Sequence, residues 1–86
     1  MKTEITPPIL SNGEFSVLTS ERETGKVLTI EFEKFIDFGK VFRIFNSFEN
    51  VNKFIETELL ENTNREFSVY DNDGNYLFTK DVNGKV

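Results

Sequence analysis

Three polar side chains near the C-terminal end of the chain alternate as the first ligands of a calcium loop do. Asp71, Asp73 and Asn75 lie at every second position of the stretch DNDGN, and carboxylate and amide oxygens are ligands that Ca²⁺ prefers. An EF-hand loop also needs glycine at its sixth position and a bidentate glutamate at its twelfth. Counted from Asp71, those positions hold Tyr76 and Val82. We therefore interpret the segment as a turn and predict no metal site.

The same stretch has the features of a β-hairpin. REFSVY precedes it and NYLFTKD follows it, and both are strand-like. The Asp-Gly pair at 73–74 favours a two-residue type I′ loop, in which both central residues take positive φ. This register places Val69 opposite Phe78 and Tyr70 opposite Leu77, so that apolar side chains face each other across the ladder.

The chain offers few side chains for catalysis, because it contains no His and no Cys. The usual nucleophile–base pairs therefore cannot be built. Carboxylates can still do acid–base chemistry, but no spacing forces two of them together. We predict that the protein is not an enzyme, that it has no catalytic residues and that it needs no cofactor.

Glu58 is an anomalous carboxylate. On a helical wheel it falls between Val51 and Phe54, inside an apolar stripe. A buried carboxylate is costly unless it is paired, and its perturbed pKa could mark a site. The interpretation that we favour is that Glu58 lies in the last helical turn and curls out to solvent, helped by Arg65 or Lys53, because Glu is almost never buried unpaired.

The elements that position these residues follow from periodicity and turn chemistry. Residues 1–12, with two consecutive prolines, form an N-terminal tail or edge segment, and residues 13–86 form a single domain. We expect a hairpin over 14–32, with its second strand from Val27 to Phe32, and a strand at about 40–45. Whether 33–45 forms one strand, two strands or a loop stays open.

A helix follows the third predicted strand. Ser47 is a good N-cap, and apolar residues then recur at helical spacing up to about Glu61. The fold class is therefore α+β: an antiparallel sheet of four or five strands with one helix packed on one face, in the order βββαββ or ββαββ. The predicted core consists of Phe15, Val17, Ile30, Phe32, Val51, Phe54, Ile55, Leu59, Phe67, Val69 and Phe78.

Net charge limits the partners of this 86-residue chain. A net charge of −5 opposes nucleic acid, whose binding rests on Lys and Arg, and it equally opposes an anionic membrane surface. No apolar run approaches the roughly 20 residues of a membrane span. We predict a cytoplasmic protein with no nucleic-acid or membrane partner.

The segments GKVFRIFNSFENVNKFIETELL and EFSVYDNDGNYLFTKD give a strand leading into a helix and then a closing hairpin. Over residues 39–84 this pattern resembles small bacterial domains of unknown function, built as strand, strand, helix and hairpin. The resemblance supplies no catalytic residues to transfer.

The predicted helix leaves one sheet face uncovered. A helix of about 14 residues is about 21 Å long and covers one face, so apolar residues on the other face would form an interaction site. The candidate interaction surface consists of Leu18, Phe38, Phe42, Tyr70 and Leu77. Alternatively, Ile5, Ile9 and Leu10 of the N-terminal segment fold over that face.

The leading functional hypothesis is a non-enzymatic protein-interaction module that self-associates, as a homodimer, or binds another protein through this face. The alternative is a small acidic inhibitor or immunity-type protein, of possible phage origin, that targets a basic partner.

Overall fold

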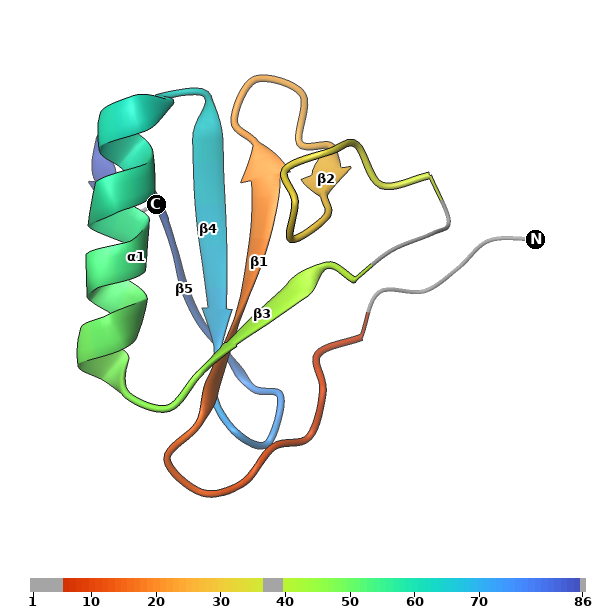
Figure 1. The fold of residues 1–86 in the computed structure, drawn as a ribbon, viewed down its shortest axis with the longest axis vertical. Coiled ribbons are helices and arrows are strands. Elements are labelled where there is room, and N and C mark those ends of the chain that lie inside the picture. The colour runs from red at the N-terminus through yellow and green to blue at the C-terminus, as the bar shows by residue number, and fades with distance from the viewer. Residues whose placement is uncertain (1–5, 37–39, 86) are drawn as a thin grey trace.

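The computed structural model describes residues 6–36 and 40–85, and it shows one helix packed against one antiparallel sheet (Figure 1). The elements in chain order are β1 (Phe15–Glu21), β2 (Val27–Leu28), β3 (Phe42–Phe45), α1 (Phe48–Glu61), β4 (Arg65–Tyr70), β5 (Tyr76–Asp81) and β6 (Gly84–Lys85). The predicted α+β class is confirmed. The described residues form six strands, because the two-residue strand β6 follows the predicted closing hairpin.

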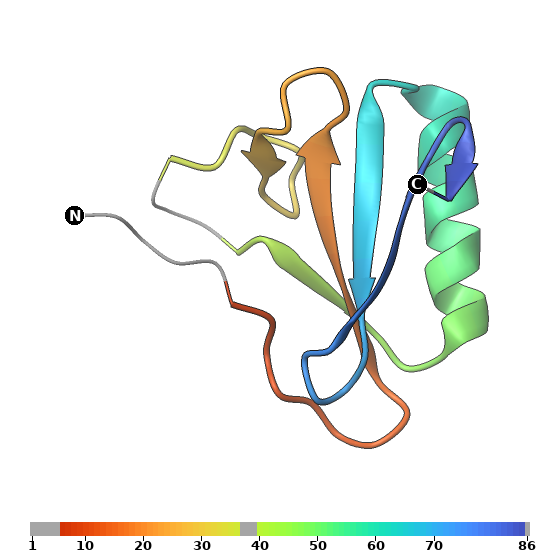
Figure 2. The same cartoon turned by 180° about the vertical axis from the view of Figure 1, so that it is seen from behind.

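Strand β1 pairs with three other strands of the sheet. β4 pairs along one edge of β1, and the sheet continues from β4 to β5 and β6. The other edge of β1 is shared, since β3 lies opposite residues 15–18 and β2 lies opposite Thr19 and Ser20. In Figure 1, β3 crosses in front of the lower ends of β1 and β4, and in the reverse view of Figure 2 it is β5 that lies in front.

The second strand of the first hairpin is shorter than the alternation of VLTIEF predicts. It ends at Leu28, and a turn follows in which the Thr29 hydroxyl accepts from the backbone N–H groups of Glu31 and Glu33, both at 3.3 Å. Phe32 then takes a positive φ of 63°. Side-chain hydrogen bonds of this kind compete with a strand ladder, so the expectation of a strand up to Phe32 is wrong.

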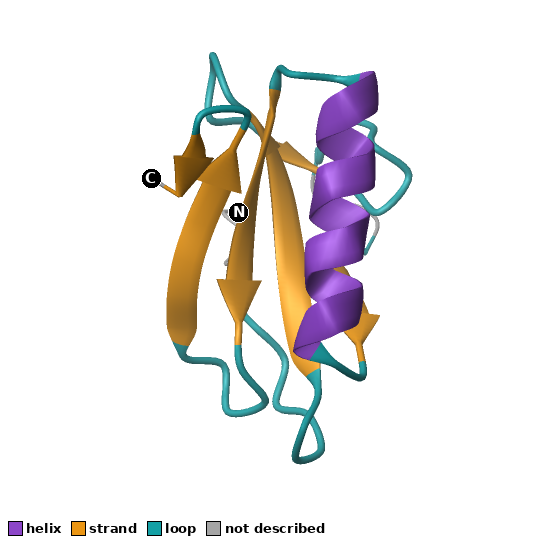
Figure 3. Ribbon diagram, turned by 90° about the vertical axis from the view of Figure 1, so that its left-hand side faces the viewer, coloured by secondary structure: helices purple, strands orange, loops and turns teal. Residues whose placement is uncertain are grey.

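Helix α1 begins and ends where the sequence predicts. The Ser47 hydroxyl accepts from the N–H of Asn50 at 3.1 Å and caps the first turn. Val51 and Ile55, four residues apart on one face of the helix, are fully buried. The helix lies over the side of the sheet formed by β1 and β3, while β5 and β6 lie at the other side (Figure 3).

The core lies between this helix and the sheet. Its buried apolar cluster consists of Val17, Val51, Ile55, Phe67 and Val69, with Phe15, Phe45, Phe54, Leu59 and Phe78 packed against it. All predicted core residues belong to this set except Ile30 and Phe32, which are half-buried in the loop after β2. Phe32 instead stacks on Phe54, with 6.5 Å between ring centroids.

The β4–β5 hairpin contains a bulge. Val69 pairs with Phe78 as predicted, but the register then shifts and Tyr70 pairs with Tyr76, which leaves Leu77 as the extra residue. Among the described residues near the turn only Gly74 has a positive φ, of 81°. A type I′ loop needs positive φ at two positions, so the turn is instead a longer loop with glycine at the left-handed position.

Candidate functional site

Strand alternation assigns side chains to the two faces of the sheet. Val17 and Val69 pair with each other and are buried under the helix, so Leu18 and Tyr70 lie on the opposite side. We call this side the far face. In β3, Ile44 lies on the far face because it pairs with Ser16, and Phe42 lies there because it pairs with Leu18.

Aromatic rings form a row on the far face. The ring of Tyr70 meets Phe42 edge-on, with 5.8 Å between centroids, and it meets Tyr76 on its other side at the same distance. Tyr76 can lie on this side of the sheet because the bulge sets two residues of β5 opposite Tyr70. Such edge-to-face pairs are favourable geometries for aromatic rings.

Apolar residues around this row are exposed. Ile44, Tyr76 and Leu77 are 44%, 57% and 42% exposed, whereas Leu18, Phe42 and Tyr70 are half-buried. The far-face patch is defined by these six residues: Leu18, Phe42, Ile44, Tyr70, Tyr76 and Leu77. It includes four residues of the candidate interaction surface, and the fifth, Phe38, lies outside the described residues.

Sequence reasoning missed Ile44 and Tyr76. Ile44 could have been found from the alternation of FRIF, because Phe42 and Ile44 share a face of any strand drawn there. Tyr76 had no such signal. Its position depends on the bulge, and the Asp-Gly pair fits a regular two-residue loop equally well.

Most of the rest of the far face is polar. Ser68 and Thr79 share a hydrogen bond of 3.0 Å, and the Tyr76 hydroxyl lies 2.7 Å from the Thr79 hydroxyl. Further along, Arg22 forms an ion pair with the buried carboxylate of Asp81 at 3.2 Å. The apolar surface is therefore limited to one end of the sheet.

The N-terminal segment docks beside the patch. The Leu10 N–H donates to the carbonyl of Asn72 at 2.7 Å, so the segment runs alongside the β4–β5 turn (Figures 1 and 2). Of the three residues that the alternative names, Ile9 is 75% exposed, Leu10 is half-buried and Ile5 lies outside the described residues. The side chain of Ile9 therefore does not cover the far face.

Burial changes the acidity of Tyr70. Its pKa is raised above the ordinary 10.0, first because its position between neighbouring rings desolvates the phenolate and second because a charged Tyr76 would repel it. Tyr70 is thus neutral at physiological pH and acts as an apolar ring with a polar tip.

The Asp71 carboxylate accepts hydrogen bonds that stabilise the β4–β5 turn. One oxygen accepts from the backbone N–H groups of Asp73 and Asn75, both at 2.9 Å, and the other accepts from the Asn75 side chain at 3.2 Å. These bonds, chiefly that from the Asn75 backbone, lower the pKa of Asp71 below 3.8. Within residues 6–36 and 40–85, no three His, Cys, Asp or Glu residues are grouped so as to hold a metal ion.

Glu58 pairs with Arg65, one of the two partners that the sequence suggested, but it does not turn out to solvent. Its carboxylate lies 3.1 Å from the Arg65 guanidinium, and the two side chains are only 17% and 16% exposed. Lys53 pairs with Glu49. The Arg65 guanidinium also lies 3.9 Å from the ring centroid of Phe32. The charge of Glu58 is therefore compensated within the fold.

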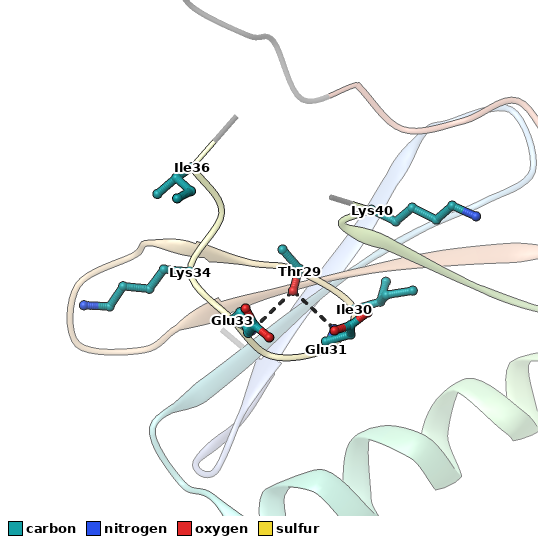
Figure 4. Close-up of a pocket in the computed structure, with 7 residues that line it drawn as sticks. All are labelled: Thr29, Ile30, Glu31, Glu33, Lys34, Ile36 and Lys40. Carbon is teal, nitrogen blue, oxygen red and sulfur yellow. Dashed lines mark hydrogen bonds between the residues drawn. The ribbon is translucent and has the colours of Figure 1, made fainter. Parts of the chain in front are cut away.

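A hollow of about 620 Å³ lies beside the loop after β2 (Figure 4). Its charged lining residues are Glu31, Glu33, Lys34 and Lys40. The two lysines point away from each other, and the two glutamates lie around the Thr29 turn, to which their backbone N–H groups donate. Among the residues that the structure describes around this hollow, no set of polar groups converges, so we assign it no chemistry.

Comparisons with protein-family models, with curated proteins and with solved structures find no match to this chain. The resemblance to small bacterial domains therefore stays a prediction. Within the described part of the chain, no helix is long and apolar enough to cross a membrane.

Proposed function

We propose that this protein is a non-enzymatic interaction module that binds a protein partner through the far-face patch. The observation that carries the proposal is the clustering of exposed Ile44, Tyr76 and Leu77 around the Phe42–Tyr70 pair on one side of the sheet. Contiguous exposed apolar surface marks interaction sites, and tyrosine is enriched at the centres of interfaces.

The position of the patch suits recognition. Its residues lie on three neighbouring strands, β3, β1 and β4, and on the bulged start of β5. Strands hold side chains in fixed relative positions, so little conformational entropy is lost when a partner binds. Polar residues border the patch, as the rim of an interface requires.

Capture experiments with paired variants test this proposal. The bait is the intact chain, and the patch variant replaces Tyr76 and Leu77 by Ser, which removes exposed apolar surface without opening the core. The matched control is Leu60→Ser, because Leu60 is 88% exposed on α1 and lies outside the patch. We expect a defined partner to be captured by the wild type and by the control but not by the patch variant. Equal capture by all three baits would contradict the proposal.

The acidic surface supports a second candidate, the inhibitor of a basic partner. The chain carries a net charge of −5, and Glu49, Glu56 and Glu61 are exposed on α1. Charge-led association weakens as ionic strength rises. Capture that is lost in high salt but unaffected by the patch variant would favour this candidate over the far-face patch.

A further inference from the structure

Strand β3 is an edge strand. It pairs with β1 on one side, and among the described residues no strand pairs with its other side. In Figure 1 no ribbon lies between β3 and the viewer. Such an edge carries backbone N–H and C=O groups that are ready to pair with another chain.

The hydrogen bonds of β1 show which groups of β3 lie at this edge. Arg22 N–H donates to the Asn64 carbonyl on the β4 side, and Glu21 N–H donates to the Lys26 carbonyl on the β2 side. The backbone N–H and C=O groups of successive strand residues point to opposite edges of the strand. Those of the odd-numbered residues of β1 therefore point towards β2 and β3. Val17 and Phe15 pair with Arg43 and Phe45.

The even-numbered residues of β3 therefore direct their backbone groups away from β1. These are Phe42 and Ile44, which carry four backbone donors and acceptors on the outer edge. The loop after β2 meets this segment at Lys40, whose carbonyl accepts from the N–H of Ile30, and at Arg43, whose guanidinium donates to the carbonyl of Ile30. Among the described residues, no strand pairs with the outer edge of β3 at Phe42 and Ile44.

We propose that two copies of the chain associate by antiparallel pairing of their β3 strands, with Ile44 of one copy facing Ile44 of the other. In this register the backbone groups of Phe42 face those of Asn46, and Arg43 faces Phe45 of the second copy. The two-fold axis passes through the Ile44 pair, so the contact is self-complementary.

Charge selects this register over its neighbour. Pairing Phe42 with Ile44 would also use the outward groups, but it would set Arg43 directly opposite Arg43 of the second copy. Like charges directly opposite each other destabilise a sheet. In the proposed register each Arg43 instead meets an aromatic ring, as it already does within one chain, where its guanidinium lies 4.8 Å from the Phe54 ring centroid.

The inference goes beyond the proposed function. Pairing at β3 joins the two sheets into one and brings the two far-face patches side by side across the axis. Tyr76 and Leu77 lie on β5, across β4 and β1 from β3, so they stay free to bind a different protein. If the β3 strands do not pair, the partner-binding proposal is unaffected. If no partner binds the far-face patch, the β3 pairing proposal is unaffected.

Single cysteines test the register, because the natural chain has none. In an Ile44→Cys variant the two Cα atoms would lie about 5.5 Å apart, within disulfide range. In Arg43→Cys the like positions are offset along the strands and lie more than about 7 Å apart, beyond that range. We expect rapid disulfide formation under mild oxidation for Ile44→Cys only. Leu60→Cys, on the exposed side of the helix, gives the rate of random collision.

Sedimentation of cysteine-free protein tests the pairing itself. We expect the wild type to shift from monomer to dimer with concentration, and Ile44→Lys to raise the dimer dissociation constant at least about tenfold, because it sets two ammonium groups together at the axis. Leu77→Lys is the matched control and should dimerise like the wild type. A wild type that stays monomeric at all concentrations would overturn the proposal, and disulfide formation through Arg43→Cys instead would overturn the register.

Discussion

Two hydroxyl groups on the far face differ in how they are satisfied. Ser68 shares its hydrogen bond with Thr79, whereas the Ser16 hydroxyl is fully buried and has no partner among the described residues. Burying a polar group without a partner costs free energy, while a satisfied one contributes modestly to stability. Replacing each serine by alanine should therefore change the free energy of unfolding in opposite directions.

We expect Ser16→Ala to raise the free energy of unfolding by about 1 kcal/mol and Ser68→Ala to lower it by about the same amount. Urea denaturation followed by circular dichroism measures both. Loss of stability in Ser16→Ala would show that its hydroxyl has a partner, such as a buried water.

The raised pKa of Tyr70 predicts how the stability of the fold depends on pH. A spectrophotometric titration should place the midpoint of Tyr70 above 10.0. Because the folded-state pKa is the higher one, Tyr70 contributes stability in full below its unfolded pKa, and that contribution is lost as pH rises through the folded pKa. Tyr76→Phe should lower the Tyr70 midpoint while leaving it raised, since burial is the larger cause. A midpoint at the ordinary value would mean that Tyr70 is open to solvent.

At the scale of elements, the β4–β5 hairpin combines a bulge with a turn held by Asp71. Gly74 has a φ of 81°, and a Cβ at this position would meet Pro7 at 3.6 Å, an ordinary contact. Any cost of adding a side chain therefore comes from backbone strain and not from crowding.

We expect Gly74→Ala to lower the free energy of unfolding by about 1–2 kcal/mol, the cost of a left-handed backbone for a residue with a Cβ. Gly74→Asn should cost less, because Asn tolerates this conformation best after glycine. Thermal denaturation of the two variants checks the order. Equal stability of wild type and Gly74→Ala would be inconsistent with this turn.

The sequence predicted these elements to different extents. Helix α1 was predictable because the Ser47 cap and the apolar periodicity indicate the same boundaries. The end of β2 was not, since VLTIEF alternates as a strand does and only the hydrogen bonds of Thr29 show where pairing stops. In the same way, the Asp-Gly pair predicted a turn but not the bulge that brings Tyr76 to the far face.

At the scale of the whole molecule, one helix covers one side of one face of the sheet. The far face is apolar at the end that includes β3 and the start of β5, and mostly polar elsewhere. Four residues of the patch were predicted from alternation, and Ile44 could have been added to them in the same way. The limits of the patch could not be predicted, because they depend on how β2 and β3 divide the edge of β1. The patch and the free edge of β3 meet at Ile44.

Amide hydrogen exchange along β3 tests most directly whether this side of the molecule is built for association. We predict that the N–H groups of Arg43 and Phe45, which bond to β1, exchange slowly at every protein concentration. Those of Phe42 and Ile44 should exchange rapidly in dilute solution and slowly at high concentration, as the second copy covers them. Rapid exchange of Phe42 and Ile44 at every concentration would contradict the account.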